Sequence, residues 1–217
     1  MQEEASYKSH KALVLNTTAF TVCFSAWMLN GVLVTYLSAN QVFDWGPVEI
    51  GWLMGIPVLT GSIFRLPAGI LTDKYGGKPI LGTLLIICAL PMFALSQADS
   101  FLSFALCSFG FGLAGVSFSI GIAYTSVWYP RHLQGTALGI FGAGNAGAAG
   151  TTLIAPTLLN QLTNQGENIE GWRMLPIYYG IMLIAMAIVF FIFSENKKPA
   201  TTNKTMREML KPLRQVR

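Results

Sequence analysis

The sequence has few charged residues for its length. Only 11% of its 217 residues are Asp, Glu, Lys or Arg, whereas a soluble domain carries about 25%. Hydrophobic residues make up 53% of the chain, and the mean hydropathy is +0.51. The apolar runs reach the roughly 20 residues that a helix needs to cross the hydrocarbon core of a bilayer. The shortage of charge therefore excludes an ordinary soluble domain and predicts an all-α membrane protein with six transmembrane helices.

Cysteine is also scarce. Cys23, Cys88 and Cys107 all fall within apolar runs, so we interpret them as small apolar packing residues rather than as a disulfide framework. The spans and loops show no nucleophile–base pair, no cluster of metal-ligand spacing and no phosphate-binding loop. The "GAGNAG" stretch departs from the G-x-G-x-x-G dinucleotide fingerprint and has no strand before it. We therefore expect neither an enzyme nor a bound cofactor or metal.

Six apolar runs divide the chain. They lie near residues 12–38, 48–71, 79–97, 101–128, 134–160 and 172–193. Short polar separators join them, so the runs are expected to form one six-helix bundle over 12–193. Residues 1–11 would be an N-terminal tail, and residues 194–217 a basic tail or a linker to a second bundle.

The basic residues indicate how the bundle is oriented. Of the fourteen Lys and Arg residues, Arg65 lies within a span and Arg173 alone falls on one side of the membrane. The other twelve share the opposite side, which the positive-inside rule places in the cytoplasm together with both termini. The pI of about 9.0 then reflects membrane topology and attraction to anionic lipid headgroups, so no nucleic-acid partner is expected. We predict a multi-pass protein of the cell inner (plasma) membrane.

Arg65 is the one charge placed well inside a span. A charge near the bilayer centre costs about 2.5–3.5 kcal/mol on insertion scales, and all ten Asp and Glu residues lie in tails, in loops or at span edges. Gly61 and Gly69 flank Arg65 on the same helix face, where small side chains leave space or allow a close helix approach. Two interpretations remain: a structural role, by bonding carbonyls or snorkelling, or an anion site. We favour the anion site.

The turn after this span carries a recognisable pattern. "GILTDKYGGK" follows the order G-x-L-x-D-K-x-G-x-K, with its motif residues at Gly69, Asp73, Lys74, Gly76 and Lys78. It resembles the loop between the second and third helices of the major facilitator superfamily, although Gly77 stands where a basic residue is common. The resemblance implies that the acidic residue helps to latch the cytoplasmic side against the other half of a transporter.

The fifth span is rich in glycine. In "QGTALGIFGAGNAGAAGTTLIAP" small residues recur every fourth position at Gly135, Gly139, Ala143 and Gly147, which predicts a seam for close helix packing. Asn145 lies within this seam. Its side chain could bond a neighbouring helix, or its amide could donate to an anion.

Together these stretches resemble the nitrate/nitrite porter family. Its members carry a glycine-rich signature with a G-N-x-G core in the fifth helix, as "GAGNAGAAG" does here, and an arginine in the second helix, as "FRLPAG" does. The resemblance covers about residues 12–195, as the N-terminal half of such a porter. It implies an anion site formed by Arg65, Asn145, Phe118, Gly115, Gly144 and Gly147. The planar fork of a guanidinium suits a flat monovalent anion such as nitrate or nitrite.

A facilitator has two six-helix halves with its site between them, so we expect a C-terminal half as a partner. It would belong to the same larger chain, to a separate polypeptide or, less favoured, to a second copy. Because no carboxylate lies within a span, the sequence favours nitrate/nitrite exchange over proton symport. Two other interpretations stay open: a facilitator for another small anion, and a non-transporting six-helix membrane subunit.

Overall fold

The computed structural model describes residues 6–199, and all regular structure in that range is helical. Eight α-helices follow one another: α1 (Tyr7–Ala39), α2 (Pro47–Tyr75), α3 (Gly77–Leu95), α4 (Phe101–Gly112), α5 (Ser117–Trp128), α6 (Arg131–Gly142), α7 (Ala146–Leu162) and α8 (Met174–Phe193). Four short 3-10 helices interrupt or join them: η1 (Leu113–Val116), η2 (Ala143–Asn145), η3 (Asn164–Gly166) and η4 (Ile169–Arg173).

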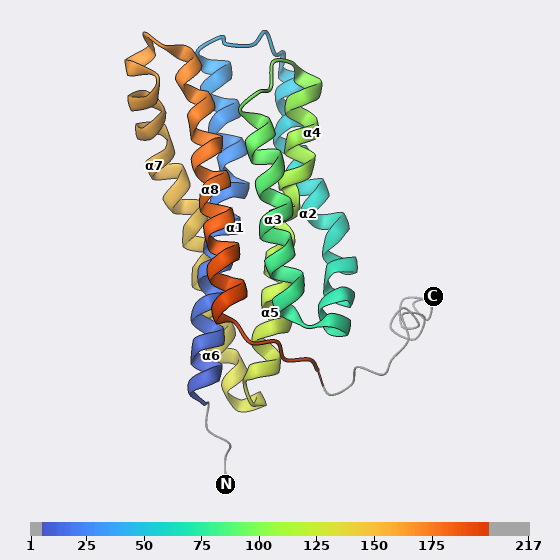
Figure 1. The fold of residues 1–217 in the computed structure, drawn as a ribbon. Helices are drawn as coiled ribbons and strands as arrows, with labels where there is room; N and C mark the ends of the chain where they lie inside the picture. Colours follow the sequence, from blue (N-terminus) through green and yellow to red (C-terminus); the bar gives the residue numbers. More distant parts are fainter. Residues whose placement is uncertain (1–5, 200–217) are drawn as a thin grey trace, which may run out of the picture.

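These helices form six passes along one bundle axis (Figure 1). Five stretches are long and apolar enough to cross a membrane, and one of them joins α4, η1 and α5 into a single span over Phe101–Trp128. The remaining pass is the fifth along the chain, expected near residues 134–160, and it consists of α6, η2 and α7. Neither α6 nor α7 alone reaches the length of a candidate span, because the glycine-rich stretch interrupts the α-helix at η2. α1 begins at Tyr7, so residues 7–11 of the expected N-terminal tail are helical.

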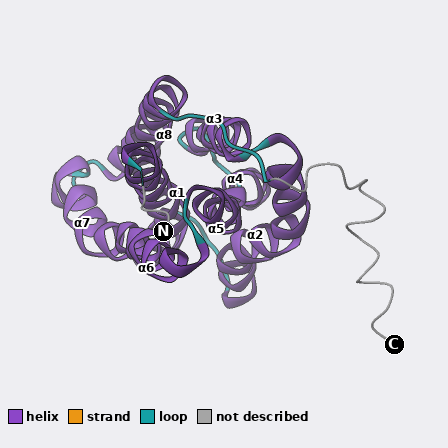
Figure 2. Ribbon diagram, turned by 90° about the horizontal axis from the view of Figure 1, so that it is seen from below, coloured by secondary structure: helices purple, strands orange, loops and turns teal. Residues whose placement is uncertain are grey.

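Seen along the bundle, α1 and α5 lie toward the middle, and α2, α3, α7 and α8 lie at the periphery (Figure 2). α3 packs along α8, and α1 packs along α7. α1 starts and α8 stops at the same end (Figure 1), where the Lys8 Nζ and a Glu195 carboxylate oxygen lie 2.9 Å apart. We call this end the basic end, because it carries nearly all the Lys and Arg residues of the described chain.

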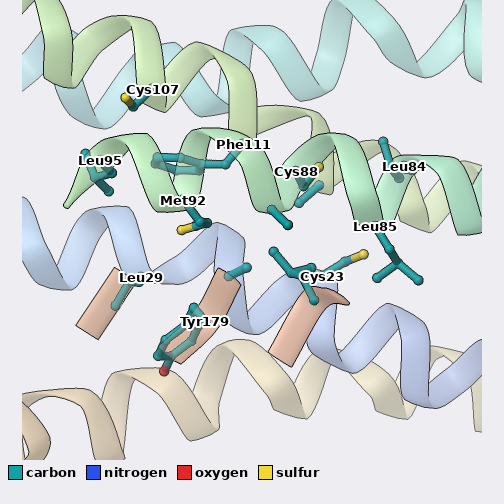
Figure 3. Close-up of a cluster of buried hydrophobic side chains, with 14 of the residues drawn as sticks. Cys23, Leu29, Leu84, Leu85, Cys88, Met92, Leu95, Cys107, Phe111 and Tyr179 are labelled. Atoms are coloured by element: carbon teal, nitrogen blue, oxygen red, sulfur yellow. The ribbon is translucent and has the colours of Figure 1, made fainter. Parts of the chain in front are cut away.

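A continuous apolar core runs between α1, α3, α4 and α8, with Phe111 and Met92 among its fully buried side chains (Figure 3). The three cysteines are buried free thiols within it or at its edge. Because lipid tails are as apolar as these side chains, apolar burial alone does not hold such helices together. Hydrogen bonds between helices also stabilise their association.

Two buried asparagines of α1 supply such contacts. The Asn16 amide donates to the Gly121 carbonyl oxygen (2.9 Å) and to the Thr125 hydroxyl (2.8 Å), which ties α1 to α5. The Asn30 amide donates to the Leu53 carbonyl oxygen at 2.7 Å. The hydroxyl of Ser108, on α4, donates to the Asn30 side-chain oxygen at 2.9 Å. α1 is thereby tied to α2, α4 and α5.

Arg173 holds the opposite end of the bundle together. Its guanidinium donates to the carbonyl oxygens of Ser96 (3.0 Å) and Ala98 (3.1 Å) in the connection between α3 and α4. It also pairs with Asp99 at 2.6 Å and with Glu170. Among residues 6–199 Arg173 is the one Lys or Arg at this end, and its guanidinium donors are largely engaged by its own half.

We expect Arg173→Ala to lower the free energy of unfolding by about 2 kcal/mol. Two donations from a charged group to carbonyl oxygens are lost, each worth about 1 kcal/mol net because solvent reaches the guanidinium, while the exposed ion pairs contribute little. Thermal unfolding in detergent measures the change. Arg131→Ala is the matched control, since the Arg131 side chain is exposed and makes no hydrogen bond or ion pair within residues 6–199. Equal stability of the two variants would contradict the role of Arg173.

Candidate functional site

The residues expected to bind the anion come from three passes of the bundle. They are Arg65 on α2, Gly115 in η1, Phe118 on α5, Gly144 and Asn145 in η2, and Gly147 on α7. Two of the passes are interrupted by a 3-10 segment part-way along their length, and the expected site residues other than Arg65 lie in or next to those interruptions. Interruptions of this kind often mark functional positions in a helix.

Arg65 is exposed in this half, as are all residues from 62 to 67. Its guanidinium makes no hydrogen bond and no ion pair with any residue between 6 and 199. Gly61, one turn earlier, faces η1 closely: a Cβ there would lie 3.3 Å from the Gly112 carbonyl oxygen and 3.6 Å from the Gly115 Cα. Gly69, one turn later, has no such neighbour within 4 Å. The glycine before Arg65 thus brings α2 against η1, and the space after it stays open.

A row of aromatic side chains on α1 links the two interruptions. Phe20 and Phe24 have ring centroids 4.3 Å apart, and Phe24 and Trp27 follow at 5.6 Å. At one end of this aromatic row, Phe20 contacts Phe118 with a centroid distance of 5.7 Å. At the other end, the Trp27 indole nitrogen would lie 3.3 Å from a Cβ at Gly115. Phe118 is only half-buried, so part of its ring remains open to a ligand.

The glycine signature packs on the same helix. A Cβ at Gly144 would lie 2.6 Å from Phe20, and a Cβ at Gly147 would lie 2.1 Å from the Thr21 carbonyl oxygen. Only glycine allows this close approach of η2 and α7 to α1. The expected small-residue seam is used only in part, since Gly135 and Gly139 have nothing within 4 Å of a Cβ. Those two positions lie on a face of α6 that this half does not cover.

Asn145 ends η2 and is exposed. Its side chain has no hydrogen-bond partner in the described part of the chain. Of the two roles considered for Asn145, the hydrogen bond to a neighbouring helix is therefore not made within residues 6–199. Arg65 and Asn145 do not bond to each other either. They are connected through packing: Gly61 against Gly115, Gly115 against the aromatic row, and the aromatic row against Gly144.

The sequence interpretation missed the aromatic row. Its members follow the spacing i, i+4, i+7, which places them on one face of a helix. That spacing could have been found, but the same spacing is expected of ordinary core packing. Only the contacts with Phe118, Gly115 and Gly144 connect it to the site.

The motif in the turn between α2 and α3 is partly covered by residues that follow α8. Gly76 has φ +91°, a conformation that favours glycine, and a Cβ there would lie 2.1 Å from the Asn196 side-chain oxygen. The Asn196 amide donates to the Tyr75 carbonyl oxygen at 2.9 Å, and Lys78 donates to the Ser194 carbonyl oxygen at 2.7 Å. Residues 194–197, here named the strap, therefore cross the basic end and cover this turn.

The strap makes further contacts with the helices that it crosses. The Tyr124 hydroxyl donates to the Glu195 carbonyl oxygen at 2.6 Å, and Lys197 lies over the Trp128 ring at 5.1 Å. Tyr129 follows Trp128 in the sequence. Burial raises the pKa of its phenol above the ordinary value, so this group stays neutral at physiological pH. The first residues of the expected 194–217 tail are thus packed, and 200–217 lie outside the described residues.

The other motif residues remain available. Asp73 is exposed and has neither a hydrogen bond nor an ion pair within residues 6–199. The Lys74 ammonium lies 5.1 Å from the ring centre of its neighbour Tyr75. Gly69 likewise faces open space. A latch against a second half stays a prediction for these three residues, whereas Gly76 and Lys78 contact the strap.

The fold and the motif define the class of protein. The family model described as Major Facilitator Superfamily matches residues 15–217, and the chain belongs to that superfamily. The architecture agrees with a solved bacterial homolog of the human lysosomal transporter Spinster, in an inward-facing and unoccupied conformation. That likeness has a TM-score of 0.70 at 15% identity and covers 96% of this chain but 48% of the other. The predicted fold, one half of a facilitator, is confirmed.

Within the superfamily the chain is similar to proteins named for nitrate and nitrite. It is 39% identical over 212 residues to the probable nitrate/nitrite antiporter NarK1 of Thermus thermophilus, covering 95% of this chain and 47% of that protein. It is 30% identical over 200 residues to the nitrite extrusion protein of Bacillus subtilis (strain 168), covering 91% and 48%. The resemblance predicted from the sequence is confirmed, and the chain spans about half the length of these curated relatives.

Proposed function

We propose that this chain is the N-terminal half of a transporter that moves nitrate and nitrite across the membrane by alternating access. The proposal depends on one observation above all: Arg65 is a cation within an apolar span that has no partner in the described residues. A charge in that position requires compensation, and a transported anion supplies it. The names of the similar proteins favour nitrate and nitrite as that anion.

Arg65 would clamp the anion with its planar donors, while Asn145 would donate from its side-chain amide. Phe118 would close over the flat face of the anion, backed by the aromatic row. Gly115, Gly144 and Gly147 would allow the helices to approach the ligand and each other. The exposure of Arg65 and Asn145 fits this arrangement, because their open faces would meet a second six-helix half across the anion.

That second half would belong to the same longer chain or to a separate polypeptide. The basic end would face the cytoplasm, with both ends of the six-helix bundle there, and the protein would reside in the cell inner (plasma) membrane. Within residues 6–199 no carboxylate lies part-way along a span, and His10, bonded to the Tyr129 hydroxyl at 3.2 Å, lies at the basic end. This favours exchange of nitrate for nitrite over proton coupling, and non-enzymatic transport over catalysis.

The test is an anion titration of thermal unfolding. The chain would be purified in detergent, alone and co-expressed with a C-terminal half, and titrated with nitrate, nitrite, chloride and formate. A ligand of the folded form stabilises it by RT ln(1 + [L]/Kd), about 2.7 kcal/mol at 100 times Kd. We expect nitrate and nitrite to raise the unfolding temperature and chloride not to. An equal response to all four anions, or no response in either form, would overturn the proposal.

A further inference from the structure

Three hydroxyl groups connect the glycine signature to the helices behind it. The Ser25 hydroxyl, on α1, lies 3.0 Å from the Gly147 carbonyl oxygen and 2.9 Å from the Thr21 carbonyl oxygen, within donor distance of both. Thr151, one turn after Gly147, donates in the opposite direction to the Ser25 carbonyl oxygen at 3.1 Å. The two helices therefore exchange hydrogen bonds at Gly147 and one turn after it.

The third hydroxyl comes from α8. The Tyr179 hydroxyl donates to the Thr151 hydroxyl oxygen at 3.0 Å, and both side chains are buried, with 9% and 3% of their surface exposed. Ser25, Thr151 and Tyr179, here named the hydroxyl chain, thus join α1, α7 and α8. Most other Ser and Thr hydroxyls of the spans bond only within their own helix; Thr152, for example, donates to the Ala148 carbonyl oxygen at 3.0 Å.

Apolar packing between α7 and α8 is weak where the hydroxyl chain lies. An open groove of about 480 Å³ is lined there by residues of α1, α7 and α8, and Gly150, Ile154 and Met182 are among them. The α7 segment after η2 therefore packs closely on α1 at Gly147 but has much less contact with α8 across the groove. Hydrogen bonds to neighbouring helices become the specific restraint on its position.

We propose that Ser25, Thr151 and Tyr179 are positioning residues that hold the turn at η2 in the conformation that presents Asn145 to the anion. The inference rests on the proposed function for its binding part. Asn145 has no hydrogen-bond partner in the described residues, so its own side chain does not fix its place. The backbone fixes the place of Asn145 instead, because Asn145 lies two residues before Gly147, whose carbonyl oxygen accepts a hydrogen bond from the Ser25 hydroxyl.

The experiment compares two substitutions at adjacent positions of α7. Thr151→Val removes a hydroxyl that bonds other helices, whereas Thr152→Val removes one that bonds only its own helix. Hydrogen–deuterium exchange of the segment 141–150 would be measured without anion and across a nitrate titration. The samples would be the detergent-purified chain, alone and co-expressed with a C-terminal half. Loss of one net hydrogen bond of about 1 kcal/mol corresponds to roughly a fivefold change.

We expect Thr151→Val to speed exchange of this segment roughly fivefold and to raise the nitrate Kd by a similar factor. Thr151→Ser should restore both, Tyr179→Phe should act in the same direction, and Thr152→Val should change neither. Equal exchange in the two valine variants would overturn the inference. So would faster exchange in Thr151→Val with an unchanged nitrate Kd. A wild-type chain without nitrate-dependent protection would instead contradict the proposed function, and the exchange rates would still decide whether the hydroxyl chain holds the turn.

Discussion

Arg65→Ala is expected to weaken nitrate binding by about 100-fold while leaving the unliganded protein as stable as before, or more so. A bidentate guanidinium–anion contact contains two charge-assisted hydrogen bonds, each worth about 1.5–3 kcal/mol, and about 3 kcal/mol corresponds to a factor of 100. Removing an unpaired cation from a span removes an insertion cost rather than a contact. Thermal unfolding with and without nitrate measures both quantities.

Arg65→Lys separates charge from shape. Lysine keeps the positive charge but loses the planar fork, so we expect about a tenfold loss of affinity, between the wild type and the alanine variant. A structural role for Arg65 makes a different prediction: alanine would lower the unfolding temperature in the absence of anion. That outcome, together with an unchanged response to nitrate, would assign Arg65 to the fold and not to the site.

Gly147→Ala is expected to destabilise the fold itself. A Cβ at this position would lie 2.1 Å from the Thr21 carbonyl oxygen and 2.7 Å from the Ser25 hydroxyl, so α7 must move away from α1. Overpacking of a close-packed interface typically costs about 1–3 kcal/mol, and we expect a loss of this size. Because Asn145 lies two residues away, nitrate-dependent stabilisation should be lost as well.

Gly150→Ala is the matched control for that substitution. It lies one turn further along α7, and a Cβ there would have nothing within 4 Å. Alanine is a better helix former than glycine by about 0.5–1 kcal/mol, so this variant should be unchanged or slightly more stable and should still respond to nitrate. Equal unfolding temperatures for the two alanine variants would show that the close approach at Gly147 is not required.

The site was predictable to different degrees at different positions. Arg65 stood out because a charge in an apolar run is costly wherever it is placed. The structure leaves its side chain exposed and without a partner in residues 6–199, and its anion role stays a prediction. The glycine signature was visible too, but its packing was not: Gly144 and Gly147 contact α1, whereas Gly135 and Gly139 face no residue of this half. A spacing of four residues defines a helix face without saying which neighbour it meets.

The motif after α2 shows the same limit. Its sequence identified the superfamily, yet its second part contacts the strap, which follows α8 more than a hundred residues later. A contact at that separation leaves no periodic trace in the sequence. The hydroxyl chain was equally hidden, because serine and threonine in a membrane helix usually bond to their own backbone.

The sequence by itself determined that the helices lie in a lipid bilayer, how many times the chain crosses it, and that one span carries an unpaired cation. These follow from the length of apolar runs and from the cost of charge in hydrocarbon, which depend on composition and not on neighbours. Tertiary structure alone decided which glycines meet another helix, which hydroxyls cross between helices, and that the aromatic row joins the two interrupted passes. Packing depends on which faces of separate helices come together, and that is set by all six passes at once.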